Sequence, residues 1–160
     1  MRRHVLRFGA IVVALIVSTV VPASSTRPEA PTVVVVGDDG TIAEIALEDS
    51  RFSLAYRHSV YERRAVEVFK VDDRERFELV QVGSPAEKTL DYYGVEGTRS
   101  RHGGWSRLSL DEPPRFTHLS LIATPTGRRT LVVGDQRVPL YDGPDANHVT
   151  ICIGPSNGCS

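Results

Sequence analysis

Two polar residues of one predicted β-hairpin, His58 and Glu67, have the clearest potential for chemistry in this sequence. In the stretch RFSLAYRHSV at 51–60, apolar side chains alternate with polar or small ones, which is typical of a strand with one buried face. The stretch AVEVFKV at 65–71 is predicted to be its partner. A turn of two or four residues centred on Glu62 and Arg63 would place His58 directly opposite Glu67 on the apolar face. Because the Cβ atoms of opposed residues lie about 4.5–5.5 Å apart, we predict a partly buried His58–Glu67 contact, in which the carboxylate favours the protonated imidazole.

The register of this hairpin rests on the same alternation. A slip by one residue would turn the polar face of one strand toward the apolar face of the other, so the register that keeps the apolar faces together is favoured. This register also pairs Leu54 with Val71, Tyr56 with Phe69 and Val60 with Ala65.

Two roles for the predicted pair stay open. It can be a structural clamp, which is the commoner role of such a pair, or it can belong to a ligand-binding or acid–base site. Ser59 follows His58 directly, and neighbouring strand residues point to opposite faces. The sequence therefore argues against a nucleophilic serine activated by this histidine.

Three aromatic residues and two cysteines are further candidates. Trp105 is expected to be a core or rim aromatic, or else a wall of a binding site together with Tyr92 and Tyr93, because these side chains give large contact areas. Cys152 and Cys159 enclose the turn-rich segment IGPSNG. They either form a disulfide bond, as an oxidising compartment would permit, or remain free thiols.

Other polar groups carry weaker signals. The remaining histidines lack the spacing of metal ligands, so no metal site is predicted. The chain has no glycine-rich phosphate loop and no dinucleotide fingerprint, so no cofactor is predicted. Interspersed acidic residues favour an ordinary solvated surface over an anion site for a group of five arginines: Arg99, Arg101, Arg107, Arg128 and Arg129.

The first residues resemble a secretory signal peptide. A basic start precedes an uncharged run at 8–21, and Val-Pro-Ala at 21–23 suits cleavage after Ala23. The run is shorter than the about 20 residues of a spanning helix, although an uncleaved anchor stays an alternative. Residues 24–31 are expected to form a polar tether. The sequence thus predicts an exported protein of the cell envelope or the surroundings.

The rest of the chain is predicted to be a single all-β domain at 32–153, an antiparallel β-sandwich or barrel, followed by a tail at 154–160. Short β-branched runs between Gly, Pro and Asp clusters are typical of this class. A hydrophobic content of 41% excludes a disordered chain, and a formal net charge of −1 gives no basic field for nucleic acid. The expected strands lie near 32–36, 41–47, 51–60, 64–71, 76–82, 89–95, 104–110, 116–123, 129–133, 137–141 and 148–153.

The motif Tyr-x-His-Ser-Val at 56–60, followed by Val-Glu at 66–67 and Phe69, resembles the signature of the domain of unknown function 1850 family. The resemblance covers roughly 32–153 and includes the Asp-Tyr-Tyr-Gly run at 91–94. Relatives often have a Gly-Ala-Gly-like loop where this chain has Ser-Pro-Ala at 84–86, so no ligand contact is carried over to that loop. Matching motif positions are Tyr56, His58, Ser59 and Glu67, to which the resemblance assigns no role.

The resemblance implies small exported proteins, many of them encoded beside permeases of the TAXI type of tripartite transporter. Together with the predicted fold, it leads to the hypothesis of a non-enzymatic binding or transport-accessory module. Its partner would be a membrane transporter component or a small solute. The alternative is a small hydrolase-like envelope enzyme with His58 and Glu67 as its acid–base pair.

Overall fold

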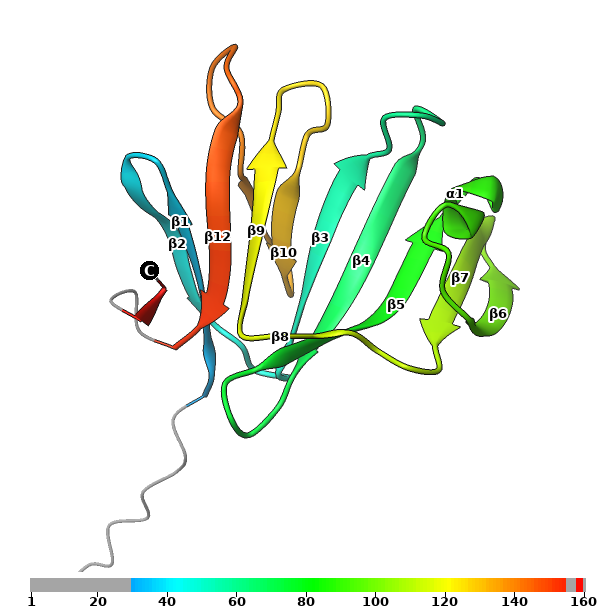
Figure 1. The fold of residues 1–160 in the computed structure, drawn as a ribbon, viewed down its shortest axis with the longest axis horizontal. Helices are drawn as coiled ribbons and strands as arrows, with labels where there is room; N and C mark the ends of the chain where they lie inside the picture. The colour runs from blue at the N-terminus through cyan, green and yellow to red at the C-terminus, as the bar shows by residue number, and fades with distance from the viewer. Residues whose placement is uncertain (1–29, 155–157, 160) are drawn as a thin grey trace, which may run out of the picture.

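The fold is all-β and consists of two antiparallel sheets, as the sequence predicted (Figure 1). The computed structural model describes residues 30–154, 158 and 159. The predicted signal segment at 1–23 and most of the predicted tether therefore lie outside the described residues. Among the described residues, no helix is long and apolar enough to cross a membrane.

The smaller sheet has the strand order β2-β1-β12-β9. Val33, Val34 and Val35 of β1 are all fully buried, because one face of the strand packs on the core and the other is covered by the C-terminal cysteines. This double cover explains a continuous valine run where a half-buried strand would alternate. The bounds are β1 Thr32–Gly37, β2 Gly40–Ala46, β9 His118–Ala123 and β12 Asn147–Ile153.

The larger sheet has the order β11-β10-β3-β4-β5-β7-β6, and the short β8 pairs with β5. Pro139 lies on the edge strand β11, where a missing N–H costs no ladder hydrogen bond. The hairpin from β10 to β11 turns at Gly134, whose φ of 53° suits glycine. The bounds are β3 Arg51–Arg57, β4 Arg64–Val71, β5 Phe77–Ser84, β6 Gly97–His102, β7 Trp105–Leu110, β8 Arg115–Phe116, β10 Thr130–Val133 and β11 Gln136–Pro139.

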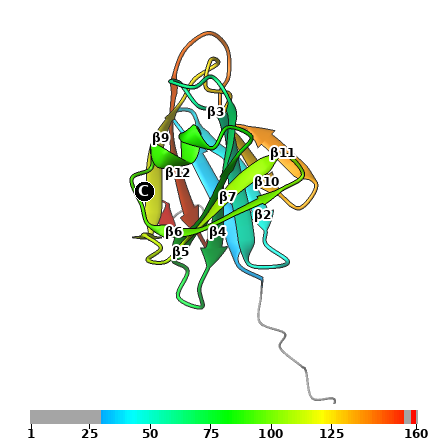
Figure 2. The same ribbon diagram turned by 90° about the vertical axis from the view of Figure 1, so that its right-hand side faces the viewer.

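The two sheets pack against each other (Figure 2), and a cluster of aromatic side chains lies in the core between them. Phe52 and Phe69 stack with ring centroids 4.9 Å apart, and Phe77 meets Phe52 edge-on at 5.3 Å. Phe116 of β8 closes the cluster against Phe77 at 5.6 Å. The alternation of β3 and β4 therefore buries the apolar residues that the sequence pattern selects.

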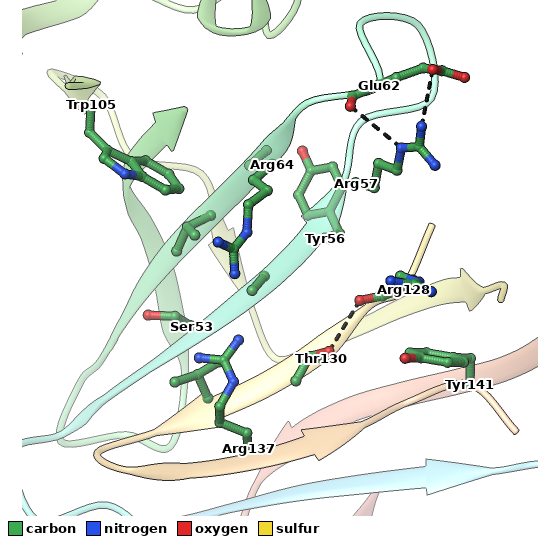
Figure 3. Close-up of a pocket in the computed structure, with 14 residues that line it drawn as sticks. Ser53, Tyr56, Arg57, Glu62, Arg64, Trp105, Arg128, Thr130, Arg137 and Tyr141 are labelled. Carbon is green, nitrogen blue, oxygen red and sulfur yellow. Dashed lines mark hydrogen bonds and ion pairs between the residues drawn. The ribbon is translucent and has the colours of Figure 1, made fainter. Parts of the chain in front are cut away.

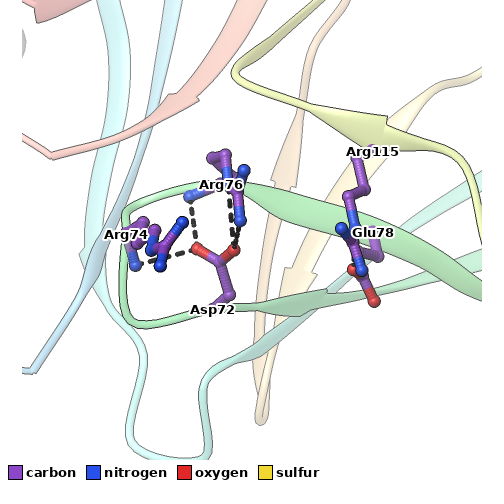
Figure 4. A network of polar contacts seen from close by, with 5 residues as sticks. All are labelled: Asp72, Arg74, Arg76, Glu78 and Arg115. Carbon is purple, nitrogen blue, oxygen red and sulfur yellow. Dashed lines mark hydrogen bonds and ion pairs between the residues drawn. The ribbon is translucent and has the colours of Figure 1, made fainter.

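The turn from β4 to β5 is held by one carboxylate (Figure 4). Asp72 Oδ1 accepts hydrogen bonds from the backbone N–H groups of Arg74 and Arg76. Asp72 Oδ2 accepts from the Arg76 guanidinium at 2.7 Å. The backbone N–H of Arg76 is the main cause that lowers the pKa of Asp72 to about 2, and the guanidinium adds to it.

The predicted strand at 89–95 is wrong, because this segment contains the short helix α1, Lys88–Asp91. Leu90 is buried, and the helix packs beside β5 and β7. Gly94, with φ 62°, follows the helix. The strand β6 was not predicted, since GTRSRH is an exposed edge strand without apolar alternation.

The predicted register of the β3–β4 hairpin is also wrong. Leu54 faces Glu67, and Tyr56 faces Ala65 rather than Phe69. The displacement along β4 is an even number of residues, so the face that each side chain occupies is as predicted while every pair differs. β3 ends at Arg57, before the predicted end at Val60, and His58 lies in the turn. The predicted direct opposition of His58 and Glu67 does not occur.

Candidate functional site

His58 holds the turn that follows β3. Its side chain is only 4% exposed. The ring nitrogen Nδ1 accepts the backbone N–H of Val60 at 3.2 Å and that of Tyr61 at 3.5 Å. The backbone of His58 closes the same turn with Arg63 and Glu62. Because the imidazole accepts the backbone N–H groups of Val60 and Tyr61, these groups need no partner on a neighbouring strand. The strand can therefore end at Arg57.

The orientation of His58 follows from these hydrogen bonds. A nitrogen that accepts two N–H groups carries no proton, so the neutral ring has its proton on Nε2. No hydrogen bond to Nε2 is seen within the described residues, where Thr89 Oγ1 is the one buried side-chain polar atom without a partner. The Nε2–H group is therefore open to solvent or to a ligand. Tyr92 packs edge-on against the ring, with centroids 4.7 Å apart.

Glu67 ends a chain of hydrogen bonds with two tyrosines. The Tyr93 hydroxyl donates to Glu67 Oε1 at 2.8 Å, and the Tyr56 and Tyr93 hydroxyls form a hydrogen bond with each other. Because the single hydrogen of Tyr93 points to the carboxylate, Tyr56 must donate to Tyr93. The chain thus runs from Tyr56 through Tyr93 to Glu67, and the second oxygen, Oε2, accepts no protein hydrogen bond within the described part of the chain.

Both phenols of this chain stay protonated at neutral pH. Burial is the main cause that raises the pKa of Tyr56 and of Tyr93 well above the usual range of tyrosine. The negative charge of Glu67 raises both further, because it disfavours a second anion nearby. Arg129 lies over the Tyr56 ring, 4.7 Å from its centroid, and its positive charge works weakly in the opposite direction.

These groups line one pocket of about 490 Å³ near the end of β3, which we call the tyrosine pocket. It has one carboxylate, that of Glu67, and two guanidinium groups, those of Arg57 and Arg129, with aromatic rings around them, so it offers both charges to a small ligand. Six of the seven candidate binding residues named from the sequence lie there: Tyr56, His58, Ser59, Glu67, Tyr92 and Tyr93. No hydrogen bond joins His58 to Glu67 or to Ser59 in the described residues.

Trp105 is the seventh candidate, and the structure places it elsewhere. It lies on the outer face of the large sheet, where it lines a second, larger pocket (Figure 3). The predicted wall of Trp105 with Tyr92 and Tyr93 therefore does not form. Tyr56 lines both pockets, since it lies near the end of the strand between them.

Sequence reasoning missed the contribution of the loop before β10 to the tyrosine pocket. Thr124, Gly127 and Arg129 all line it. Arg129 was named only within a dispersed group of arginines, which the structure does not bring together. Arg99, for example, pairs with Asp91 of α1 at 2.6 Å. The missing signal was the pairing of β10 with β3, a contact that is distant in sequence.

The two cysteines form a disulfide bond, one of the two alternatives that the sequence left open. Both are buried, and Cys159 packs with Val34 on the outer side of the small sheet. Among residues 30–154, 158 and 159, no cluster of three or more His, Cys, Asp or Glu side chains that could hold a metal ion occurs.

Comparison of the chain with protein-family models, with curated proteins and with solved structures finds no match.

Proposed function

We propose that the protein is an exported binding module that holds a small organic solute in the tyrosine pocket and assists a solute-uptake system. The observation that carries this proposal is the Tyr56–Tyr93–Glu67 chain in a pocket of ligand size: Glu67 Oε1 accepts from Tyr93, while Oε2 has no protein hydrogen bond among the described residues. A half-buried carboxylate with free accepting capacity is a good partner for an ammonium or hydroxyl group. The disulfide and the signal-like first residues support export.

The charges of the pocket favour a zwitterionic solute such as an amino acid. Glu67 suits the ammonium group, Arg129 suits the carboxylate, and Tyr92 offers an exposed ring for the side chain. The transport-accessory role rests on the resemblance of the motif at 56–60 to the domain of unknown function 1850 family.

A small envelope enzyme is the second candidate. It is favoured by the presence of His58, with an open Nε2–H, in the same pocket as Glu67. An acid–base pair also needs a nucleophile or an activated water between the two groups. Ser59, the neighbouring hydroxyl, makes no hydrogen bond to the imidazole within the described residues. Binding therefore explains more of the geometry than catalysis does.

A thermal-shift screen tests the binding function. The purified protein is heated with each amino acid, and with sugars, dicarboxylates and divalent metals for comparison. A ligand at 100 times its dissociation constant stabilises the fold by about 2.7 kcal/mol, which raises the melting temperature by several degrees. We expect at least one amino acid to give this shift, and we expect the shift to be lost in Tyr93→Phe and His58→Ala.

Tyr141→Phe is the matched control, because Tyr141 lines the outer pocket and not the tyrosine pocket. It should keep the response. Amino acid shifts that survive in Tyr93→Phe and His58→Ala, or a screen in which no amino acid shifts the wild-type protein, would overturn the proposal.

A further inference from the structure

The outer face of the large sheet carries a groove of about 750 Å³ that faces away from the core (Figure 3). Alternation along the strands sends one set of residues inward to the phenylalanine cluster and the other set outward to this groove. The outward residues at its centre are small, so the floor lies low between longer neighbours. This floor consists of Ser53, Ala55, Val66, Thr130 and Val132.

Aromatic side chains bound the groove. Trp105 of β7 lies above Gly83 of β5, where a Cβ atom would come within 3.6 Å of its ring. Tyr141, which follows β11, lies on the opposite side (Figure 3). The groove therefore has flat apolar surfaces at two sides and space of the size that metabolites occupy.

The groove carries an excess of positive charge. The lining has four arginines, and Glu62 is the only carboxylate within it. That carboxylate already binds Arg57 at 3.0 Å. Arg64 of β4 and Arg137 of β11 extend toward each other across the floor (Figure 3), and neither has a carboxylate within 4.0 Å in the described part of the chain.

Two guanidinium groups that converge without a counter-ion repel each other, and an anion between them removes that repulsion. Guanidinium groups bind carboxylate or phosphate oxygens through paired N–H donors. Arg128, also without an ion-pair partner among the described residues, supplies a third positive charge along the same groove. The arrangement thus matches a ligand with one acidic group between Arg64 and Arg137 and a second acidic group near Arg128.

We propose that this groove binds a small organic anion that carries at least two carboxylate or phosphate groups. The groove and the tyrosine pocket share Tyr56 and Arg57 at the end of β3, but Arg64 and Arg137 line only the groove, so its anion site lies outside the proposed solute site. Arg64 and Arg137 are the recognition residues, and Trp105 packs against the carbon skeleton of the anion.

Calorimetric titration at low ionic strength tests the proposal. The probes are citrate, succinate, glutarate and fructose 1,6-bisphosphate, with glucose as the neutral comparison. We expect at least one anion to bind, and glucose not to bind. Arg64→Gln and Arg137→Gln should each weaken the anion at least tenfold. Arg101→Gln is the matched control, because Arg101 is an exposed arginine of β6 that does not line the groove.

Any result that departs from these expectations overturns the proposal. Absence of binding by all four anions at millimolar concentration would do so. So would equal weakening in Arg101→Gln, because binding would then follow the general surface charge. A lipid headgroup is a second source of phosphate, so vesicles of phosphatidylglycerol are tested by sedimentation; binding to vesicles alone also contradicts a free anion. Tyr93→Phe should leave anion binding unchanged, which separates this test from that of the tyrosine pocket.

Discussion

Opening the disulfide between Cys152 and Cys159 is expected to destabilise the small sheet and with it the whole domain. The bond joins β12 to the segment that covers β1, and Cys159 is buried against Val34 there. Val34 is fully buried, although it lies on the side of β1 away from the core. Without the cross-link, this side of β1 would depend on a short terminal segment that is free to separate.

The expected magnitude follows from the loop that the bond closes. The cysteines are separated by 7 positions. In the chain-entropy model, a loop of this length lowers the entropy of the unfolded chain by enough to stabilise the fold by about 2.4 kcal/mol. For a domain of this size, 1 kcal/mol shifts the melting temperature by about 3–5 °C, so reduction should lower it by about 7–12 °C.

Thermal unfolding followed by circular dichroism measures this shift with and without a reductant. The Cys152→Ala/Cys159→Ala double variant should melt near the reduced wild-type protein, and the reductant should not affect it. A shift below about 2 °C on reduction would refute the entropic reasoning. Titration of two free thiols in the unreduced protein would refute the disulfide itself.

Three further predictions concern single side chains. Tyr93→Phe should lower the free energy of unfolding, measured in urea, by about 1–3 kcal/mol, because it leaves Glu67 Oε1 without its donor in a partly buried site. Asp72→Asn should make the loss of stability in acid less steep. The pKa of Asp72 is lowered to about 2 in the fold, so the ionised carboxylate stabilises the fold above pH 4, and this stabilisation is lost as the pH falls toward 2. Urea midpoints measured across this pH range detect the difference. Phe69→Ala should lower the free energy of unfolding by about 3–5 kcal/mol in the same urea assay, because the Phe69 ring stacks at the centre of the core. Val60 is 62% exposed, so Val60→Ala should change it by less than about 0.5 kcal/mol.

Each of these expectations has a contrary result. A Tyr93→Phe protein as stable as the wild type would mean that water replaces the phenol at Glu67. Parallel acid profiles of the wild type and Asp72→Asn would mean that the turn carboxylate is not linked to folding. Equal costs for Phe69→Ala and Val60→Ala would contradict the position of the core.

The sequence predicts the class of fold well, because alternation of period two reports directly on burial. Phe52 and Leu54 point inward while Ser53 points outward, as the pattern of β3 requires. The pattern fails where burial is not one-sided. The segment at 89–95 contains apolar and aromatic residues in a spacing that a strand and a short helix both satisfy, and only its docking beside β5 and β7 decides between them.

The candidate site is partly predictable for the same reason. Parity along β3 and β4 brings Tyr56 and Glu67 to one face in any register with an even displacement, so both reach the tyrosine pocket although the predicted pairing is wrong. The register itself depends on the turn. Because His58 accepts two backbone N–H groups through its side chain, the turn is longer than the hairpin rules predict. Side-chain capping by histidine has no marker in the spacing of residues.

β3 explains how one small domain can present two different kinds of binding surface. Its inward residues end at Tyr56, whose hydroxyl begins the chain to Glu67, and its outward residues Ser53 and Ala55 form part of the floor of the groove on the outer face. The first surface combines one carboxylate with two guanidinium groups, whereas the second has four guanidinium groups and one carboxylate that is already paired, so the two surfaces suit ligands of different charge. Since the backbone of β3 separates the two faces, a substitution such as Tyr93→Phe acts on the first surface and Arg137→Gln on the second. The two proposed sites can therefore be tested independently of each other. If Tyr93→Phe and Arg137→Gln each abolished both solute binding and anion binding, the two sites would not be separated by β3 as described.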